Sequence, residues 1–244
     1  MRGIEEKAEQ GGTLWWETEP DRSALRRYFH ERSVSRKNYT SVQIKKVKAV
    51  KRWDRKEGLA LRRFEPQTEL EELLLRRRTR RFRSAAEPDA ELLARLLQFA
   101  VGVTDERSGY FAYPSPGALY PCTLFLSVDL PELRGNVYRY NPYLHVLELY
   151  APGRADPLEA AIIDRELAAF PIKLFFASDY QLLEEKYGEL SYRLLNQEIG
   201  HMAQNLSLCA EDLALNTVCI GGFYEEEFKR AVPDYDLLYV MVVG

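Results

Sequence analysis

The sequence lacks the features that mark exported, membrane-spanning or disulfide-rich proteins. Its three cysteines, Cys122, Cys209 and Cys219, are odd in number, widely spaced and outside any CxxC pair, which predicts neither a disulfide framework nor a zinc site. The first thirty residues hold no apolar core of a secretory signal, and no apolar run approaches the ~20 residues that a membrane helix requires. We therefore expect a cytoplasmic protein that does not contact a membrane.

Motifs for common cofactors and metals are absent as well. Neither GxGxxG nor GxxxxGK followed by Ser or Thr occurs, so the two standard loops that cradle nucleotide phosphates are missing. HExxH is also missing, and the three histidines, His30, His145 and His201, show no metal-ligand spacing. The sequence therefore predicts no bound metal, and we interpret each histidine as packed or capping.

The composition is otherwise typical of a soluble globular protein, with 46% hydrophobic and 29% charged residues. The net charge of −3 conceals an uneven distribution, because residues 22–83 hold 21 Lys/Arg against 7 Asp/Glu, whereas residues 84–244 hold 11 against 24. A basic segment of this kind indicates a site for phosphate or an acidic partner, or else a solvated charged face.

The apolar pattern divides the chain near residue 66. Residues 1–65 carry little apolar periodicity and several glycines and prolines, so we interpret them as an N-terminal basic extension. From Glu69 onward leucines recur at helical spacing, and residues 66–244 are predicted to form one compact domain.

Within that domain the order of elements predicts an α+β fold. Helices are expected from Glu69, after Pro88, over residues 159–170 and over residues 190–215, and strands over residues 122–128, 137–140, 144–149, 172–177, 218–220 and 237–243. The longest helix carries an apolar stripe formed by Leu194, Ile199, Met202, Leu206 and Leu213. We expect this helix to lie centrally.

The first strong functional signal is an arginine cluster, residues 76–83, in which six of the eight residues are Lys or Arg. These charges repel one another unless an anion or an acidic surface compensates them. Guanidinium groups bind phosphate in a bidentate fashion, and on a helical turn several of them can converge on one phosphate. The alternative is a solvated helix face or a nucleic-acid patch, although no nucleic-acid-binding motif accompanies the arginines.

A second signal is the segment Pro114-Ser115-Pro116-Gly117-Ala118-Leu119-Tyr120-Pro121. Its prolines and glycine predict a rigid turn whose backbone can approach a flat ring closely, and Ser115 can donate a hydrogen bond to a heteroatom of such a ring. Taken alone, the segment is also consistent with a plain turn before a strand.

The arginine cluster and the Pro114–Pro121 segment resemble, in the same order along the chain, two motifs of the SagB-type dehydrogenases. This family is a branch of the nitroreductase-like FMN enzymes. In that family an Arg-Arg-Ser-x-Arg pattern holds the FMN phosphate, and Arg76, Arg77, Arg78 and Arg80 fall on its places, with Arg78 where serine is usual. The turn resembles the family's most distinctive motif, Pro-Ser-x-Gly-Ala-x-Tyr-Pro.

Further segments extend the resemblance over residues 70–244. The run from Lys186-Tyr187-Gly188 to Tyr192-Arg193 resembles the family's Lys-Tyr-Gly-x-Arg-x-Tyr-Arg, with Leu190 where arginine is usual. Other matches are Gly102-Val103-Thr104, Gly200-His201 with Gln204-Asn205, Gly221-Gly222-Phe223 and the closing strand over residues 238–244.

The resemblance implies a nitroreductase-like α+β fold, in which helices flank a central, mainly antiparallel sheet and a long central helix lies at a dimer interface. It implies FMN as the cofactor, bound by Arg76, Arg77, Arg78, Arg80, Pro114, Ser115, Gly117, Arg193, Asn205, Gly221 and Gly222. It also implies that Lys186 and Tyr187 form the catalytic pair.

The implied activity is oxidation of a thiazoline or oxazoline ring to a thiazole or oxazole in a ribosomally synthesised, post-translationally modified peptide. A base would remove a ring proton while flavin N5 accepts a hydride, and the pKa of either Tyr187 or Lys186 would have to be lowered for this task. Which of the two is the base stays open.

The implied assembly is a homodimer in which the long helix buries its stripe against a second subunit. Whether a cyclodehydratase docks through residues 22–63 also stays open.

Two other functions remain open. An NAD(P)H-dependent reductase of nitro, quinone or dehydroamino-acid groups would use the same scaffold, since a fold does not determine a reaction. A flavin-free module that binds a peptide or nucleic acid would use the basic segment, and Arg78 and Leu190 are the departures from the family pattern that favour it. The negative net charge and the lack of a nucleic-acid motif argue against nucleic acid.

Overall fold

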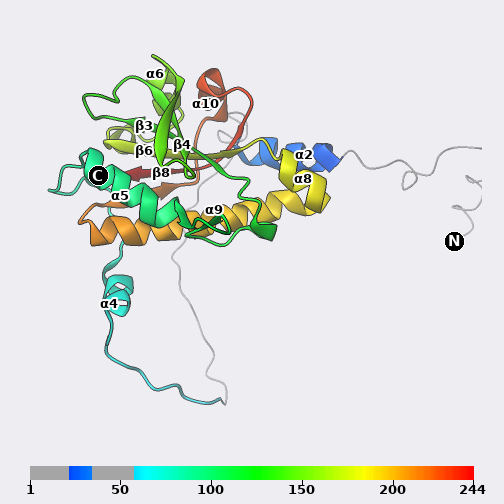
Figure 1. Cartoon of the computed structure of the whole chain (residues 1–244). Coiled ribbons are helices and arrows are strands. Elements are labelled where there is room, and N and C mark those ends of the chain that lie inside the picture. The colour runs from blue at the N-terminus through cyan, green and yellow to red at the C-terminus, as the bar shows by residue number, and fades with distance from the viewer. Residues whose placement is uncertain (1–21, 35–57) are drawn as a thin grey trace, which may run out of the picture.

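A six-stranded sheet lies between two layers of helices in the computed structural model, which describes residues 22–34 and 58–244 (Figure 1). Its strands are β3 (Thr123–Val128), β4 (Val137–Asn141), β5 (Val146–Ala151), β6 (Ile172–Ser178), β7 (Thr217–Ile220) and β8 (Asp236–Val243). They follow the order β5-β4-β3-β6-β8-β7, and each neighbouring pair is antiparallel. The predicted α+β fold with a central antiparallel sheet is confirmed.

The central strand β6 is buried along its whole length because helices cover both faces of the sheet. One face packs against α5 (Ala90–Val101) and α9 (Ser191–Asp212), and the other packs against α6 (Ala155–Ala160) and α10 (Glu225–Ala231) (Figure 1). A strand covered on both faces has no solvent side, which explains why the sequence of β6 is almost continuously apolar.

The apolar stripe of α9 packs inside its own subunit. Ile199, Met202 and Leu206 are buried in the core shared with α5 and the sheet, and Leu194 and Leu213 are partly buried against that core. The expectation that this stripe is buried against a second subunit is therefore wrong, because the sheet already covers it. Within the described part of the chain, no helix is long and apolar enough to span a bilayer.

The region predicted as one helix over residues 159–170 is instead interrupted. The helix α6 is followed by α7 (Arg165–Ala168), which begins after Asp164, whose carboxylate accepts hydrogen bonds from two main-chain N–H groups of α7. Between the two helices Ile162 forms an antiparallel bridge with Phe223. The cap and the bridge replace the hydrogen bonds of a continuous helix, so that prediction is wrong.

Short elements connect the helical layer to the sheet. A separate two-stranded sheet, β1 (Val103–Asp105) and β2 (Tyr110–Phe111), precedes the 3-10 turn η1 (Pro116–Ala118). The helix α8 (Gln181–Tyr187) and the turn η2 (Gly188–Leu190) lead directly into α9. These connections bring the predicted turn and the Lys-Tyr segment to the same end of α9.

The arginine cluster begins where α4 (Glu69–Arg76) ends. A capping box starts this helix, in which Thr68 and Glu71 each bind the other's main-chain N–H, and the helix lies away from the sheet against α9 (Figure 1). The residues that follow are not helical, and Thr79 bridges to Thr217 at the edge strand β7. The arginines therefore do not share a helical face as predicted, and they pass beside the sheet edge instead.

Part of the predicted extension docks on the domain. The helix α2 (Arg22–Val34) lies beside α8 near one end of α9 (Figure 1). Arg26 on α2 forms ion pairs with Glu184 at 2.6 Å and with Asp236 at 2.7 Å. The rest of the basic extension up to residue 57 lies outside the described residues, so the domain boundary near residue 66 stays a prediction.

Candidate functional site

The turn η1 meets the last residues of α8. Gly117 has a φ of 60°, a left-handed conformation that glycine adopts without strain. A Cβ at this position would overlap the Lys186 amine nitrogen and would lie 2.5 Å from the Tyr187 hydroxyl oxygen. The polar ends of these two side chains therefore converge on the bare backbone of Gly117. Because Lys186 is exposed and Tyr187 is half-buried, a ligand can reach both from solvent.

Beneath this turn, Glu198 of α9 is fully buried. Its carboxylate accepts a hydrogen bond from Ser115 Oγ at 2.5 Å and another from the main-chain N–H of Cys122 at 3.2 Å. Ser115 Oγ in turn accepts a hydrogen bond from the main-chain N–H of Tyr120 at 2.8 Å. In this arrangement Ser115 gives its only hydroxyl hydrogen to Glu198, whereas the expected donation to a ring heteroatom needs that hydrogen to point outward.

The surroundings of Glu198 disfavour its charge. Burial raises the pKa of Glu198 to about 7, and the hydrogen bonds from Ser115 and Cys122 oppose that shift. The pKa of Tyr113 and the pKa of the Cys122 thiol lie well above their ordinary values, first because of burial and then because of the charge on Glu198. A carboxyl group whose pKa burial raises toward neutrality, beneath two polar groups that solvent can reach, is a feature typical of functional sites.

A polar cavity of about 250 Å³, which we call the arginine cavity, lies on another side of α9. Its lining comprises Arg77, Thr79, Gly200, Ala203, Gln204, Ser207, Thr217, Cys219 and Tyr239. Open space surrounds the position where a Cβ of Gly200 would stand, so the helix backbone is bare there. A guanidinium beside amide and hydroxyl groups is a donor set that suits an anion joined to a heteroaromatic ring.

The other arginines of the cluster have different surroundings. Arg80 donates from Nη1 to Glu211 Oε2 at 2.6 Å, and this hydrogen bond lowers the pKa of Glu211. Arg78 is exposed and donates to the main-chain carbonyl of Arg77 at 2.8 Å. Arg76 is also exposed. A phosphate at this cluster would therefore have to share Arg80 with a carboxylate that already binds it.

The candidate residues fall on two sides of α9. Gly200 and Gln204 face the arginine cavity, whereas Glu198 and His201 contact the segment that carries Gly117. With 3.6 residues per turn, successive residues lie ~100° apart around a helix, so the two pairs point to different sides. The arginine cavity and the Gly117 turn therefore lie on different sides of α9.

Arg193, Gly221 and Gly222 lie toward the arginine cavity. Arg193 precedes Gly200 on α9 by roughly two helical turns, so the two residues lie on the same side of the helix. The two glycines follow β7 directly, just beyond Cys219 in the lining of the cavity.

Pro114 and Asn205 lie on the other side of α9. The carbonyl of Pro114 is 3.2 Å from His201 Nδ1. The side-chain amide of Asn205 donates to the carbonyls of Ala100 at 3.2 Å and Ala112 at 2.9 Å. In this structure the Asn205 amide therefore ties α9 to α5 and to the segment after β2.

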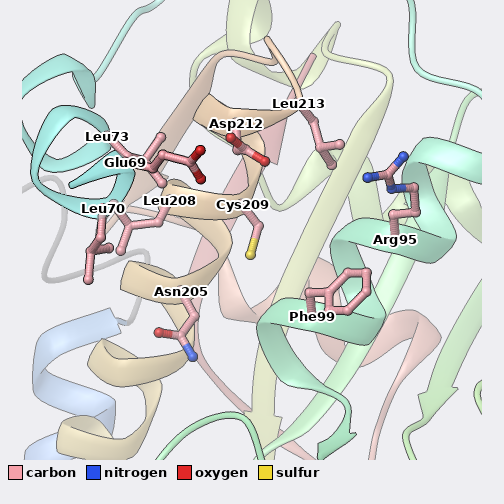
Figure 2. A pocket seen from close by; sticks show the side chains of 10 residues that line it. All are labelled: Glu69, Leu70, Leu73, Arg95, Phe99, Asn205, Leu208, Cys209, Asp212 and Leu213. Carbon is pink, nitrogen blue, oxygen red and sulfur yellow. The ribbon is translucent and has the colours of Figure 1, made fainter.

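An apolar pocket of about 430 Å³ opens between α4, α5 and α9 (Figure 2). Leu70 of α4, Phe99 of α5 and Leu208 of α9 contribute to its walls, and Asn205 is the predicted site residue at its edge. Leu70 and Phe99 are 57% and 61% exposed. Exposed apolar side chains grouped in this way mark an interaction surface more often than a catalytic centre.

Comparison with known proteins decides the family. The chain matches the Nitroreductase family over residues 73–244. It belongs to the nitroreductase family. The matched range contains the whole arginine cluster, the Gly117 turn and the Lys186-Tyr187 pair. Both sides of α9 therefore lie inside a domain of oxidoreductase type.

Two curated relatives illustrate the breadth of this family. The chain is 35% identical over 180 residues to a Methanocaldococcus jannaschii protein named as a nitroreductase, covering 72% of this chain and 90% of that protein. It is 31% identical over 151 residues to the Escherichia coli microcin B17-processing protein McbC, covering 57% of this chain and 54% of that protein. The match to McbC thus spans about half of its length.

Solved structures share the fold. A chain of the E. coli microcin synthetase McbBCD complex with truncated pro-MccB17 bound has a TM-score of 0.67 at 21% identity, over 96% of this nitroreductase family member and 98% of that chain. A nitroreductase-type structure from Ralstonia eutropha has a TM-score of 0.62 at 21% identity, over 76% and 87% of the two chains. At these identities the likeness establishes the fold alone.

Sequence reasoning missed Glu198. A signal for it exists in the sequence, because Leu195, Glu198 and Met202 recur at helical spacing and place a carboxylate on the apolar face of the helix. A buried carboxylate is costly unless it is hydrogen-bonded, so its presence on that face indicates a specific role.

Sequence reasoning also missed a cluster that joins α2 to the C-terminal part of the domain. The ligand atoms of His30, Glu225 and Asp236 lie within 4.8 Å of one another. Glu225 lies 2.7 Å from His30 Nε2, and Asp236 binds Arg26 at 2.7 Å and Lys229 at 2.6 Å. Because basic side chains already engage both carboxylates, we interpret the cluster as an ion-pair network that docks α2.

Proposed function

We propose that this nitroreductase family member is an FMN-dependent dehydrogenase that oxidises thiazoline or oxazoline rings to thiazole or oxazole in a ribosomally made peptide. The observation that carries the proposal is the convergence of Lys186 and Tyr187 on Gly117, inside the turn that resembles SagB-type dehydrogenases. The 31% identity to the microcin B17-processing protein McbC supports a peptide as the substrate.

The residues of the arginine cavity fit FMN. Arg77 offers a guanidinium to a phosphate, Gln204 offers an amide to ring heteroatoms, and the bare backbone at Gly200 allows a flat ring to approach. We therefore assign FMN binding to this cavity, with Arg76, Arg80, Arg193 and the Gly221-Gly222 pair around it. When bound, FMN supplies the two-electron acceptor that no amino-acid side chain here provides.

The chain's own residues would orient the peptide and move a proton. Conversion of an azoline to an azole removes a hydride from one ring atom and a proton from another, and the product gains aromatic stability. Lys186 or Tyr187 takes the proton, and the other holds the ring, because both polar groups reach the same point above Gly117. The missing side chain of Gly117 leaves room for these two polar groups beside the backbone of the turn.

We also propose that the protein works as a homodimer. Two chains could supply the arginine cavity and the Gly117 turn to one FMN, since within one chain these surfaces lie on different sides of α9. At about 250 Å³ the arginine cavity is also smaller than the ~300–1,000 Å³ usual for ligand sites, so one chain supplies only part of the site. The exposed leucines of α4 beside Phe99 offer an apolar surface for the second copy.

A cyclodehydratase is the partner that we propose beyond the homodimer, because an azoline must be formed before it can be oxidised. The full-length likeness to a chain of the microcin synthetase McbBCD complex supports an assembly of this kind. The basic segment, residues 22–63, is our proposed docking surface, and within it the structure describes α2 and residues 58–63. The cytoplasm remains the predicted location.

The proposal is tested first by colour and then by turnover. The visible spectrum of the purified protein, with chromatography of the heat-released chromophore, should identify FMN at about one per chain. Incubation with a thiazoline-containing peptide should then remove two hydrogens per ring, as measured by mass spectrometry. A colourless protein that cannot be reconstituted with FMN would favour the flavin-free binding module.

Matched variants separate catalysis from folding. Lys186→Ala and Tyr187→Phe should retain FMN and lose peptide oxidation, whereas Glu185→Ala, an exposed neighbour on α8, should retain both. Loss of FMN from both variants of the pair would show that the pair is structural and would contradict the proposed role.

A reductase is the second candidate. The 35% identity to the M. jannaschii protein named as a nitroreductase, over 90% of that protein, favours it. Here NAD(P)H would deliver a hydride to the flavin, and a nitro, quinone or dehydroamino-acid compound would be reduced. Rapid NAD(P)H oxidation that depends on such a compound, together with no change in the thiazoline peptide, would select this function.

A further inference from the structure

Glu198 is a buried carboxyl group that the proposed chemistry does not use. It is fully buried on α9, and its two hydrogen-bond partners, Ser115 Oγ and the Cys122 main-chain N–H, are both neutral. A buried carboxyl group without a cation is costly to ionise, so the protonated form of Glu198 is accessible.

Counting hydrogens at Ser115 shows what such a proton would change. The hydroxyl has one hydrogen and two lone pairs, and the Tyr120 main-chain N–H occupies one lone pair. When Glu198 is ionised, the hydroxyl hydrogen is given to its carboxylate. When Glu198 is protonated, the carboxyl O–H can donate to the remaining lone pair of Ser115. The hydroxyl hydrogen of Ser115 is then free to turn away from Glu198.

We propose that Glu198 is a positioning residue, whose proton determines whether Ser115 can donate a hydrogen bond to a ligand at the Gly117 turn. The identification of that ligand as the flavin rests on the proposed function. The hydrogen-bond exchange between Glu198 and Ser115 does not rest on it, because it follows from the contacts within one chain.

Titratable groups surround Glu198, but within the described residues no cation forms an ion pair with it. Those that face it or the same turn are Tyr113, Tyr120 and Cys122 from the segment between β2 and β3, Lys186 and Tyr187 from α8, and His201 from α9 itself. The buried residues of α5 are all apolar, and the residues of β7 and β8 that line the arginine cavity lie on another side of α9.

The direction of the pH effect follows from the folded-state titration. Burial raises the pKa of Glu198 to about 7, so the carboxyl group holds its proton below neutrality and loses it above. The outward hydrogen of Ser115 is thus available at lower pH and withdrawn as the pH rises. If the Ser115–Glu198 hydrogen bond only held α9 against the turn, its donor would not change with pH.

Infrared difference titration of the unliganded protein between about pH 5 and 9 tests the exchange directly. Wild-type protein should show a protonated-carboxyl band that disappears with a midpoint near neutrality. Glu198→Gln should lack the band. In Ser115→Ala the midpoint should rise by about 1 pH unit, because the carboxylate loses its hydroxyl donor. His201→Asn, which alters an ionisable side chain that contacts the Pro114 carbonyl of the same segment, should titrate like wild type.

Two results of this titration would overturn the inference. One is a wild-type protein without the band, which would mean that Glu198 is ionised throughout. The other is a midpoint that Ser115→Ala leaves unchanged, which would mean that the two groups are not coupled. If Glu198→Gln does not fold, the comparison of wild type with Ser115→Ala still decides between coupling and its absence.

The flavin-loaded protein provides a second readout. Gln at position 198 can accept from Cys122 and donate to Ser115, as the protonated carboxyl group does, so the flavin absorption of Glu198→Gln should stay in its low-pH form. Wild type should shift with the infrared midpoint, and Ser115→Ala should not shift. A shift that persists in Glu198→Gln would overturn the inference. A protein that binds no FMN would contradict the proposed function, and the infrared titration alone would then decide the inference.

Discussion

Arg80 binds Glu211 through a hydrogen bond of 2.6 Å, although the two residues lie 131 positions apart in the sequence. The arginine cluster is thus partly neutralised by the chain itself, at the end of α9 that follows the arginine cavity. A phosphate bound there would compete with this carboxylate for Arg80.

Glu211→Gln should therefore bind FMN more tightly, because it removes a negative charge beside the phosphate and releases Arg80. We expect the Kd to fall about 3- to 10-fold at low ionic strength, with a smaller effect at high salt. Riboflavin, which has no phosphate, is the control ligand, and its Kd should not change. Equal effects on the two ligands would show that Glu211 acts on the ring or on the fold.

Arg77→Ala should weaken FMN binding, since Arg77 lines the arginine cavity. Loss of one charge-assisted hydrogen bond predicts a Kd increase of about 10- to 100-fold, measured by flavin fluorescence quenching. Arg78→Ser restores the serine usual in SagB-type enzymes and serves as the control. Its effect should be small, because the exposed Arg78 side chain contacts only the carbonyl of Arg77 among the contacts seen here. A larger increase in the Kd for FMN in Arg78→Ser than in Arg77→Ala would reassign the phosphate contact to Arg78.

Gly117→Ala should reduce peptide oxidation by about 100-fold while FMN stays bound, because the new Cβ displaces Lys186 and Tyr187. Gly109→Ala is a matched control. Both glycines have positive φ, 60° and 69°, but no atom lies within 4 Å of the position of a Cβ on Gly109. Similar losses of kcat/KM in the two variants would attribute the effect to backbone strain and not to displacement of the proposed catalytic pair.

Glu198 should make folding stability depend on pH. Its folded-state pKa of about 7 lies above the ordinary value of 4.5, so the folded protein binds the proton more tightly than the unfolded chain. The stabilisation is complete below pH 4.5, declines as the pH rises and is lost above about 7, with a total of roughly 3 kcal/mol. Denaturant titrations should show this slope in wild type and a flatter profile in Glu198→Gln. Parallel profiles would refute the assignment.

Arg26→Ala should loosen α8, whose last two residues are the proposed catalytic pair. Arg26 forms two ion pairs while only 17% exposed, and its guanidinium lies 4.1 Å from the centre of the Tyr180 ring. We expect a loss of about 2 kcal/mol in unfolding free energy and faster amide exchange in α8. Arg134→Ala breaks a well-exposed ion pair with Asp129 and should cost much less. Unchanged rates of amide hydrogen exchange in α8 of Arg26→Ala would mean that the contacts with α2 do not stabilise α8.

The sequence by itself determined the features whose physics is local. The spacing of leucines predicts α4 and α5, and the Asn141-Pro142 turn predicts the β4–β5 hairpin, in which the Asn141 side chain accepts hydrogen bonds from two main-chain N–H groups. The resemblance of the arginine cluster and the Gly117 turn to one family also required only the order of residues. The family match over residues 73–244 confirms its broader part, membership of the nitroreductase family.

Only the tertiary structure decided which groups meet. Arg80 and Glu211, or Ser115 and Glu198, are brought together by the packing of α9 against distant segments, and no local pattern specifies such pairs. The structure also shows that the apolar stripe of α9 packs in the core of its own chain, and that the candidate site residues lie on two sides of this helix. The physical reason is that burial and hydrogen bonding depend on distances in space, which separation along the chain does not determine.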